Sequence, residues 1–287
     1  MASILTTMRT FGDDLMDKVS QLLREVSEEA IEPRFESLRS RDVRYKSHGE
    51  VVTIADEEAE QLLKARLGEL VPDALVVGEE EFSGSSDLQE ALNHHRVWLV
   101  DPLDGTANFV AGSPQWAVMV ALVEGDETTA AWIWQPAAGV MYRAQLGAGS
   151  DRNGIPIIPT PASAEMADLR GAVLTRFLDG PMTERIDASR HRFRSLGPGT
   201  TSAGVDYPLL AVGEQDFVMF WRTLPWDHAP GSLIVSQSGG SARRLKGDRY
   251  SPKRMGEGLL AVSDHRRWQP IRNALLDESN DESRSDG

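Results

Sequence analysis

The segment from residue 98 to 109, WLVDPLDGTANF, sets the organisation of this chain. Residues 96–100 are apolar and strand-forming, and Asp101-Pro102 predicts the end of that strand, because proline has no amide hydrogen and restricts the residue before it. Asp104-Gly105 is a turn dipeptide, and Thr106 follows where a helix is able to begin. The first backbone amides after the turn would have no partner within the helix and would point out of the turn. This predicts an anion site beside two carboxylates. The alternative is a solvated turn between core elements.

Composition limits the class of protein. The 287 residues are 40% hydrophobic and 26% charged, which suits a soluble protein with one large α/β domain or two halves that share a cleft. The net charge of -14 argues against nucleic acid or an anionic membrane as the main partner. No cysteine is present, so disulfides, thiolate zinc sites and cysteine nucleophiles are excluded. The acidic N-terminal stretch lacks the apolar core of a signal peptide or membrane span, and we expect a cytoplasmic protein.

The first elements include a candidate cap. Apolar residues between 4 and 30 recur at spacings of three and four, which predicts one long amphipathic helix. Two short strands, 43–46 and 51–54, are expected around a turn at 47–50. Thr53 and Asp56 form a capping-box pattern at the start of the next helix. Capping alone explains both residues, so the pattern does not by itself indicate catalysis.

A second group of acids follows a buried strand. Residues 75–77 predict that strand, and Glu79, Glu80 and Glu81 come directly after Gly78. Three acids in a row are often a solvated loop. Ligands nevertheless gather at strand ends in open α/β sheets, so this position makes the acids candidate ligands.

The rest of the chain predicts an antiparallel meander and then a second α/β half. Asp227 is predicted as the N-cap of a helix at 225–237, with Pro230 in its first turn. The proline-rich stretch 156–164 predicts a boundary, which gives an N-terminal half (1–155), a C-terminal half (156–276) and a disordered tail (277–287). The remaining expected strands are 116–123, 128–134, 140–145, 171–175, 193–196, 216–221, 242–245 and 258–262, with a hairpin at 153–154 and helices at 182–191, 208–212 and 268–276.

The acids at element ends predict metal chemistry. Glu79, Asp101, Asp104 and Asp227 each stand at the end or start of an element. Carboxylate, carbonyl and water oxygens suit Mg²⁺, and two such ions suit in-line attack at phosphorus. The six histidines show no paired spacing for zinc, and no phosphate-binding glycine loop of the nucleotide-binding kinds occurs.

Three blocks in the sequence resemble a known family. Residues 78–80 (GEE), 98–109 (WLVDPLDGTANF) and 226–231 (WDHAPG) look like the signature blocks of the inositol monophosphatase family of magnesium-dependent, lithium-sensitive phosphatases. Lys46, the segment 52–56 and Gly239-Gly240 extend the resemblance. It implies an α+β fold, a layered αβαβα sandwich, usually paired as a homodimer. It also implies a phosphomonoesterase that acts on a small phosphorylated metabolite, with two to three Mg²⁺ ions per site and inhibition by Li⁺.

The resemblance also assigns metal ligands. Glu79, Asp101 and the Leu103 carbonyl would hold the first ion. Asp101, Asp104 and Asp227 would hold the second, and Glu79 would also contact a third, weaker ion. Lys46 and Glu80 are possible further members of this site.

The implied catalytic residues come from the two segments already described. The amides of Gly105 and Thr106 would hold the phosphate. Thr106 with Asp56, steadied by Thr53, would orient and deprotonate the attacking water, so the mechanism is direct hydrolysis without a phosphoenzyme. A capping pair would then double as a proton relay.

One departure from the family pattern concerns the substrate. Phe220 stands where inositol phosphatases carry a glutamate that accepts hydrogen bonds from ring hydroxyls. Unpaired hydroxyls would cost about 1–3 kcal/mol each, so the leaving group need not be inositol. Ser202 and Ala203 are expected at the substrate wall. Histidinol phosphate, a 3′-phosphonucleotide or a sugar phosphate are all open. Alternatives from other classes are a non-catalytic metal- or phosphate-binding regulatory protein and a purely structural acidic domain.

Overall fold

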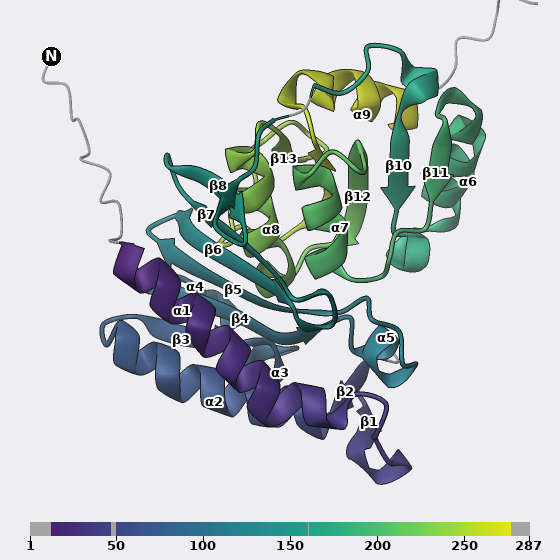
Figure 1. The fold of residues 1–287 in the computed structure, drawn as a ribbon. Helices are drawn as coiled ribbons and strands as arrows, with labels where there is room; N and C mark the ends of the chain where they lie inside the picture. Colours follow the sequence, from purple (N-terminus) through teal and green to yellow (C-terminus); the bar gives the residue numbers. More distant parts are fainter. Residues whose placement is uncertain (1–12, 47–49, 160, 277–287) are drawn as a thin grey trace, which may run out of the picture.

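Two β-sheets alternate with three layers of helices in the computed structural model (Figure 1), which describes residues 13–46, 50–159 and 161–276. Two helices cover the outer face of the first sheet, two lie between the sheets and two cover the outer face of the second. In that order the helices are α1 (Asp13–Val26) and α2 (Ile54–Leu70), α7 (Ala203–Ala211) and α8 (Pro225–Gln237), α6 (Gly180–Ser189) and α9 (Trp268–Leu276). The predicted αβαβα sandwich is confirmed.

Alternation along the strands explains the layers. Successive strand residues face opposite sides of a sheet. Val118 and Val120 accordingly pack in the core under α1 and α2, whereas Met119 packs in the core with α7 and α8. In the second sheet, Val218 joins that middle core and Met219 joins the outer core with α9. Both sheets are therefore apolar on both faces.

The first sheet has seven strands in the order β3-β4-β5-β6-β7-β8-β9. β3 pairs parallel with β4, and all later neighbours are antiparallel, as the predicted meander requires. Asn153 and Gly154 have φ of 52° and 79° and form the predicted hairpin turn. The strands are β3 (Leu75–Gly78), β4 (Arg96–Asp104), β5 (Ala117–Glu124), β6 (Glu127–Gln135), β7 (Val140–Gln145), β8 (Gly149–Arg152) and β9 (Ile155–Pro156).

The second sheet has five strands in the order β11-β10-β12-β14-β13. It is built from chain beyond residue 169, and the predicted division of the chain near residue 156 stays a prediction. Its strands are β10 (Arg170–Val173), β11 (Ser195–Gly197), β12 (Phe217–Arg222), β13 (Ser241–Arg244) and β14 (Glu257–Val262). A separate hairpin joins β1 (Val43–Tyr45) to β2 (Val51–Thr53), and the short helices are α3 (Glu79–Phe82), α4 (Leu88–Leu92) and α5 (Thr106–Val110).

Strand β4 is longer than predicted. It runs through Pro102 to Asp104 instead of ending at Asp101. Asp101 pairs with Met119 and Asp104 with Ala117, and the register shifts between these pairs. Pro102 therefore lies where the ladder is irregular, which is where a strand tolerates a residue without an amide hydrogen.

Helix α7 begins five residues before the predicted start at Pro208, which lies inside the helix. A proline amide cannot bond the carbonyl of Gly204, four residues earlier. Gln135 Nε2 donates to that carbonyl at 2.8 Å instead. A distant side chain thus stabilises a turn that local sequence reasoning assigns to a loop.

The predicted cap of helix α8 is wrong. The helix begins at Pro225, with Leu224 as N-cap, and Asp227 is its third residue. Proline is favoured at the first helical position because its φ is already helical, so the cap lies three residues before the predicted Asp227. Pro230 is consequently inside the helix rather than in its first turn.

Several other predictions are met only in part. α1 continues as a π-helical turn over Ser27–Ile31, and the part of the predicted helix before residue 13 lies outside the described residues. The turn at 47–49 and the tail 277–287 also lie outside them. Other strand and helix boundaries fall within about two residues of prediction. Within the described part of the chain, no helix is long and apolar enough to cross a membrane.

Candidate active site

Three carboxylates meet where β3, β4 and α8 come together. Gly78 of β3 pairs with Val100 of β4, so the next residues, Glu79 and Asp101, emerge side by side. Helix α8 packs on β4 and brings Asp227 to them. One oxygen of each carboxylate lies within 4.8 Å of the other two. We call Glu79, Asp101 and Asp227 the carboxylate cluster.

The carboxylate cluster has few hydrogen-bond donors. The Leu103 amide donates to Asp101 at 3.0 Å, and Asp227 accepts no hydrogen bond from any described residue. Burial raises the pKa of both aspartates well above the usual range, and the charge of Glu79 raises each further. Partly buried like charges with few donors are stabilised by a cation, and an all-oxygen set suits Mg²⁺. The residues present therefore fit the ion that the sequence predicts.

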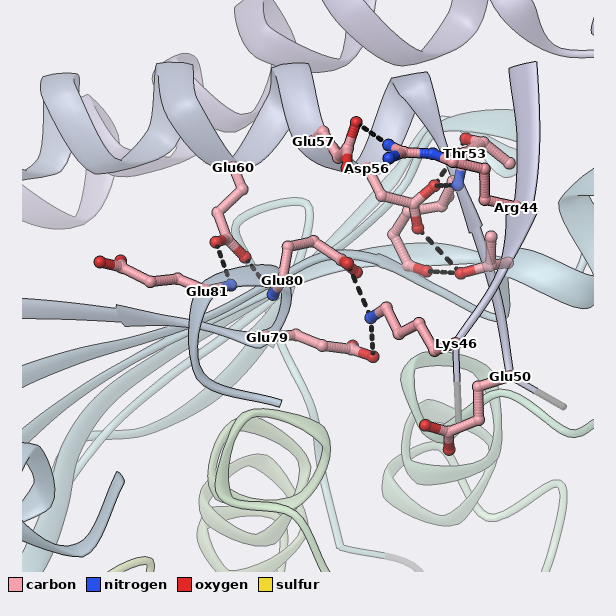
Figure 2. Close-up of polar contacts among 12 residues, drawn as sticks. Arg44, Lys46, Glu50, Thr53, Asp56, Glu57, Glu60, Glu79, Glu80 and Glu81 are labelled. Atoms are coloured by element: carbon pink, nitrogen blue, oxygen red, sulfur yellow. Dashed lines mark hydrogen bonds and ion pairs between the residues drawn. The ribbon is translucent and has the colours of Figure 1, made fainter. Parts of the chain in front are cut away.

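Lys46 supplies one internal cation to this region (Figure 2). Its Nζ lies 3.2 Å from Glu79 Oε1 and 2.7 Å from Glu80 Oε2. Burial lowers the pKa of Lys46, but the two carboxylates outweigh burial and raise it. Burial and the charge of Glu79 raise the pKa of Glu80 to about 8. One lysine thus offsets only part of the negative charge.

Asp104 lines the cavity that also contains the carboxylate cluster, but it has more hydrogen-bond donors than the residues of the cluster. Its carboxylate accepts hydrogen bonds from the Ser202 hydroxyl and from the amides of Ala203 and Gly204, at 3.3 and 2.7 Å. These donors form the start of α7, where amides lack helical partners. Burial raises the pKa of Asp104 to about 6. The structure therefore places Asp104 beside the carboxylate cluster without bringing its oxygens into it.

Of the two residues predicted at the substrate wall, Ser202 and Ala203, one lines the cavity. Ala203 lines the cavity. Ser202 is fully buried behind Asp104, and it is not among the described residues that line the cavity.

Thr53, Asp56 and Thr106 form one hydrogen-bonded unit. Asp56 Oδ2 accepts from the Thr53 amide at 2.8 Å and from Thr53 Oγ1 at 2.6 Å. Thr53 Oγ1 also accepts from the Ala55 amide at 3.1 Å, so the predicted capping box is confirmed. Thr106 Oγ1 lies 2.9 Å from both Asp56 Oδ1 and the Leu103 carbonyl. The cap of α2 is thereby connected to the first residue of α5.

Gly105 makes the turn before α5 possible. Its φ is 84°, a conformation that side chains other than glycine's rarely adopt. A Cβ there would lie 2.8 Å from the Gln115 carbonyl oxygen. Gly105 and Thr106 both line the cavity, as an anion site at this turn requires.

Sequence reasoning missed Glu60. Its carboxylate accepts hydrogen bonds from the amides of Glu80 and Glu81, at 2.7 and 2.9 Å (Figure 2). A Cβ on Gly78 would come within 2.3 Å of that carboxylate, so the glycine makes room for it. Glu60 follows Asp56 by four residues on α2, which places both on one helix face; that spacing was the available signal.

The cavity extends from the carboxylate cluster along the second sheet and has a volume of about 410 Å³. Phe220 lines it and stacks on Tyr207, with ring centroids 4.9 Å apart. Arg222, at the end of β12, also lines it and forms an ion pair with Glu50. Sequence reasoning missed Arg222 and the neighbouring Phe177, because nothing local shows that they face the cavity.

Comparison with known proteins decides the family. The model of the inositol monophosphatase family matches residues 13–281. The chain belongs to this family. Its members are phosphomonoesterases, and the chain is an enzyme of that class.

Individual relatives carry different names. A Thermotoga maritima protein named fructose-1,6-bisphosphatase/inositol-1-monophosphatase is 30% identical over 200 residues, which cover 69% of this chain and 73% of that protein. A Vibrio cholerae protein named Nus factor SuhB is 31% identical over 209 residues, which cover 68% and 72%. The solved structure of an inositol monophosphatase from Zymomonas mobilis has a TM-score of 0.77 and 25% identity, and the match covers 93% of this chain and 99% of that one.

Proposed function

We propose that this inositol monophosphatase family member is a Mg²⁺-dependent phosphomonoesterase that hydrolyses a small phosphorylated metabolite by direct attack of water. The observation that carries the proposal is the carboxylate cluster, three acids drawn together with one hydrogen bond from a backbone amide among them. Glu79, Asp101 and the Leu103 carbonyl are proposed to hold one ion, and Asp101, Asp227 and Asp104 a second. Mg²⁺ bound there supplies Lewis-acid stabilisation of charge on the phosphoryl oxygens.

The protein groups around the cluster support the remaining steps. The Gly105 and Thr106 amides lie at the start of α5, where they are available to hold phosphate oxygens. Thr106 Oγ1 donates to Asp56, so a water that donates to Thr106 would have a path for its proton to that carboxylate. Thr53 fixes the orientation of Asp56 through two hydrogen bonds. The cap is in this way proposed to act as a proton relay.

Phe220 supports a substrate other than inositol phosphate. Its ring is 3% exposed and stacked on Tyr207, so it offers the leaving group no hydrogen-bond acceptor. Histidinol phosphate, a 3′-phosphonucleotide and a sugar phosphate remain candidate substrates. The family resemblance further supports a third, weaker ion, inhibition by Li⁺ and a homodimer, and composition supports a cytoplasmic location.

A panel of phosphate esters tests the proposal. Phosphate release should require Mg²⁺ and disappear with EDTA. Asp101→Asn should lower kcat by about a thousandfold or more, because metal assistance is worth several kcal/mol. Asp248→Asn, an exposed control, should leave the rate unchanged. No metal-dependent release from any ester would refute the proposal, and inositol 1-phosphate as clearly the best substrate would refute the argument from Phe220.

A regulatory role without catalysis is the second candidate, and the relative named Nus factor SuhB is the observation that favours it. All the acids, threonines and glycines that the enzymatic proposal needs are present in this chain, which favours catalysis. Binding of Mg²⁺ and phosphate without turnover would favour the regulatory role.

A further inference from the structure

The wall of the cavity that comes from the second sheet is cationic. Among the described residues that line the cavity, Arg176 and Arg222 are the only lysine or arginine side chains. They share this cavity with Glu79, Asp101 and Asp227, in a chain whose net charge is -14. We infer, on the basis of the proposed function, that the substrate carries a second anionic group besides its ester phosphate, and that Arg222 and Arg176 bind it.

Phe177 orients both guanidinium groups. The guanidinium carbon of Arg176 lies 5.2 Å from the centroid of the Phe177 ring, and that of Arg222 lies 4.7 Å from the same centroid. A guanidinium stacked on a ring keeps the N–H donors at its edge available for a planar anion. Phe177 is 38% exposed and lines the cavity, so the stack lies where a ligand reaches it. Because both guanidinium groups stack on the Phe177 ring, we assign the subsite to an anion rather than to a stacked base.

Arg222 already has one anionic partner and has donors to spare. It pairs with Glu50, which also lines the cavity, so this ion pair lies within the binding space. A guanidinium has five N–H donors, and one carboxylate does not use them all.

Part of the remaining cavity lining is apolar. Leu174, Pro198, Phe220 and Trp221 border the cavity, and their side chains accept no hydrogen bonds from hydroxyls. A polyol with a single phosphate would find no hydrogen-bond acceptor on these four side chains and would bring no second anion to the arginines. A compound with an anion at each end matches the arrangement better, whether the second group is a phosphate or a carboxylate.

Matched pairs of esters test the inference. Fructose 1,6-bisphosphate against fructose 1-phosphate, and adenosine 3′,5′-bisphosphate against adenosine 3′-monophosphate, add a second phosphate. 3-Phosphoglycerate against glycerol 3-phosphate adds a carboxylate. We expect kcat/KM with Mg²⁺ to be about tenfold or more higher for the doubly anionic member of at least one pair, because hydrogen bonds between charged groups are strong. Equal kcat/KM within every pair would overturn the inference.

Variants assign the preference to the arginines. Arg222→Gln should lower the ratio of the two kcat/KM values about tenfold, mainly through KM, and Arg176→Gln should lower it less. Arg222→Lys should restore part of the ratio. Arg249→Gln is the control, because Arg249 is exposed and does not line this cavity. If Arg222→Gln slows both members of a pair equally, Arg222 only ties Glu50 to β12, and the inference is wrong.

A binding measurement separates this inference from the proposed function. Calorimetric titration of the same ester pairs, with Ca²⁺ in place of Mg²⁺, reports affinity whether or not turnover occurs. Tighter binding of the doubly anionic ester by the wild type, lost in Arg222→Gln, would support the subsite even if no ester were hydrolysed. Equal affinities in the wild type would overturn it even if hydrolysis were fast.

Discussion

The carboxylate cluster and a second set of buried acids use the same side chains with different partners. Asp56 and Asp104 each accept three hydrogen bonds, and Glu60 accepts two. Asp206, also buried, accepts from the Thr200 amide at 3.1 Å. We call Asp56, Glu60, Asp104 and Asp206 the donor-held carboxylates. Their donors lie mostly at the starts of helices, so these acids fix backbone.

The carboxylate cluster has few such donors, and the Leu103 amide that donates to Asp101 is the one from the backbone among the described residues. Asp227 accepts no hydrogen bond within the described ranges, and Glu79 relies on Lys46. A buried acid that holds no backbone and repels its neighbours contributes little to folding. Donors, rather than burial alone, therefore distinguish acids that fix backbone from acids that are left for a cation, and Asp104, a proposed ligand of the second ion, takes both roles. Two changes to the donor-held carboxylates, one to a donor of Asp56 and one to the cluster test that conclusion.

Asp206 is expected to give the largest effect. Burial raises its pKa to about 7, so between about pH 4 and 7 the folded chain holds a proton that the unfolded chain has lost. The native state then binds more protons, and this group's contribution to the free energy of unfolding falls as pH rises, by on the order of 4 kcal/mol across that window. Asp206→Asn removes the titration, so urea unfolding should show the variant gaining stability relative to wild type from pH 4 to 7. A difference that is independent of pH would contradict this account.

Glu60 should have a purely structural effect of intermediate size. Glu60→Ala leaves the amides of Glu80 and Glu81 without their acceptor, which should cost about 1–3 kcal/mol of unfolding free energy. Glu69→Ala is the matched control, because Glu69 is exposed on the same helix. Urea unfolding of both variants measures the difference. Equal losses of unfolding free energy in the two variants would mean that Glu60 does not stabilise the fold through the amides of Glu80 and Glu81.

Thr53 should have the smallest effect on stability. Thr53→Val removes the hydroxyl that caps α2 and should cost about 1 kcal/mol, and Thr53→Ser should recover most of it. If Asp56 also relays a proton, kcat should fall in Thr53→Val by more than the loss of folded protein explains, and serine should restore it. A stability loss with unchanged kcat would leave Thr53 and Asp56 as a cap alone.

Much of the fold could be predicted from the sequence because its signals are local. The meander strands, the Asn153-Gly154 hairpin and the capping box at Thr53 depend on periodicity and short motifs, and all are confirmed. The start of α7 could not be predicted, because it depends on Gln135, 69 residues away from Gly204. The range of α8 was predicted correctly, but its cap was misplaced, because Asp227 is a good cap by type whereas Pro225 sets the first helical position.

In the candidate site, too, local signals could be read from the sequence, whereas contacts between distant parts of the chain could not. Glu79, Asp101 and Asp227 could be predicted from element ends and signature blocks, and the structure brings them together. The contact between Asp104 and the start of α7 could not be predicted, because the donors to Asp104 lie about a hundred residues later in the chain. Glu60 and Arg222 were missed for a related reason, since their roles depend on which face of an element meets the cavity.

The most direct test of the central claim is the effect of Mg²⁺ on the unfolding free energy of wild type and Asp227→Asn, without substrate. We expect a saturable increase in the unfolding free energy of the wild type, about 2.7 kcal/mol at a hundred times the dissociation constant, and little or none for the variant. Asp248→Asn should behave like the wild type. The same increase in Asp227→Asn, or no increase in the wild type, would contradict the claim that the carboxylate cluster has few donors because a cation belongs there.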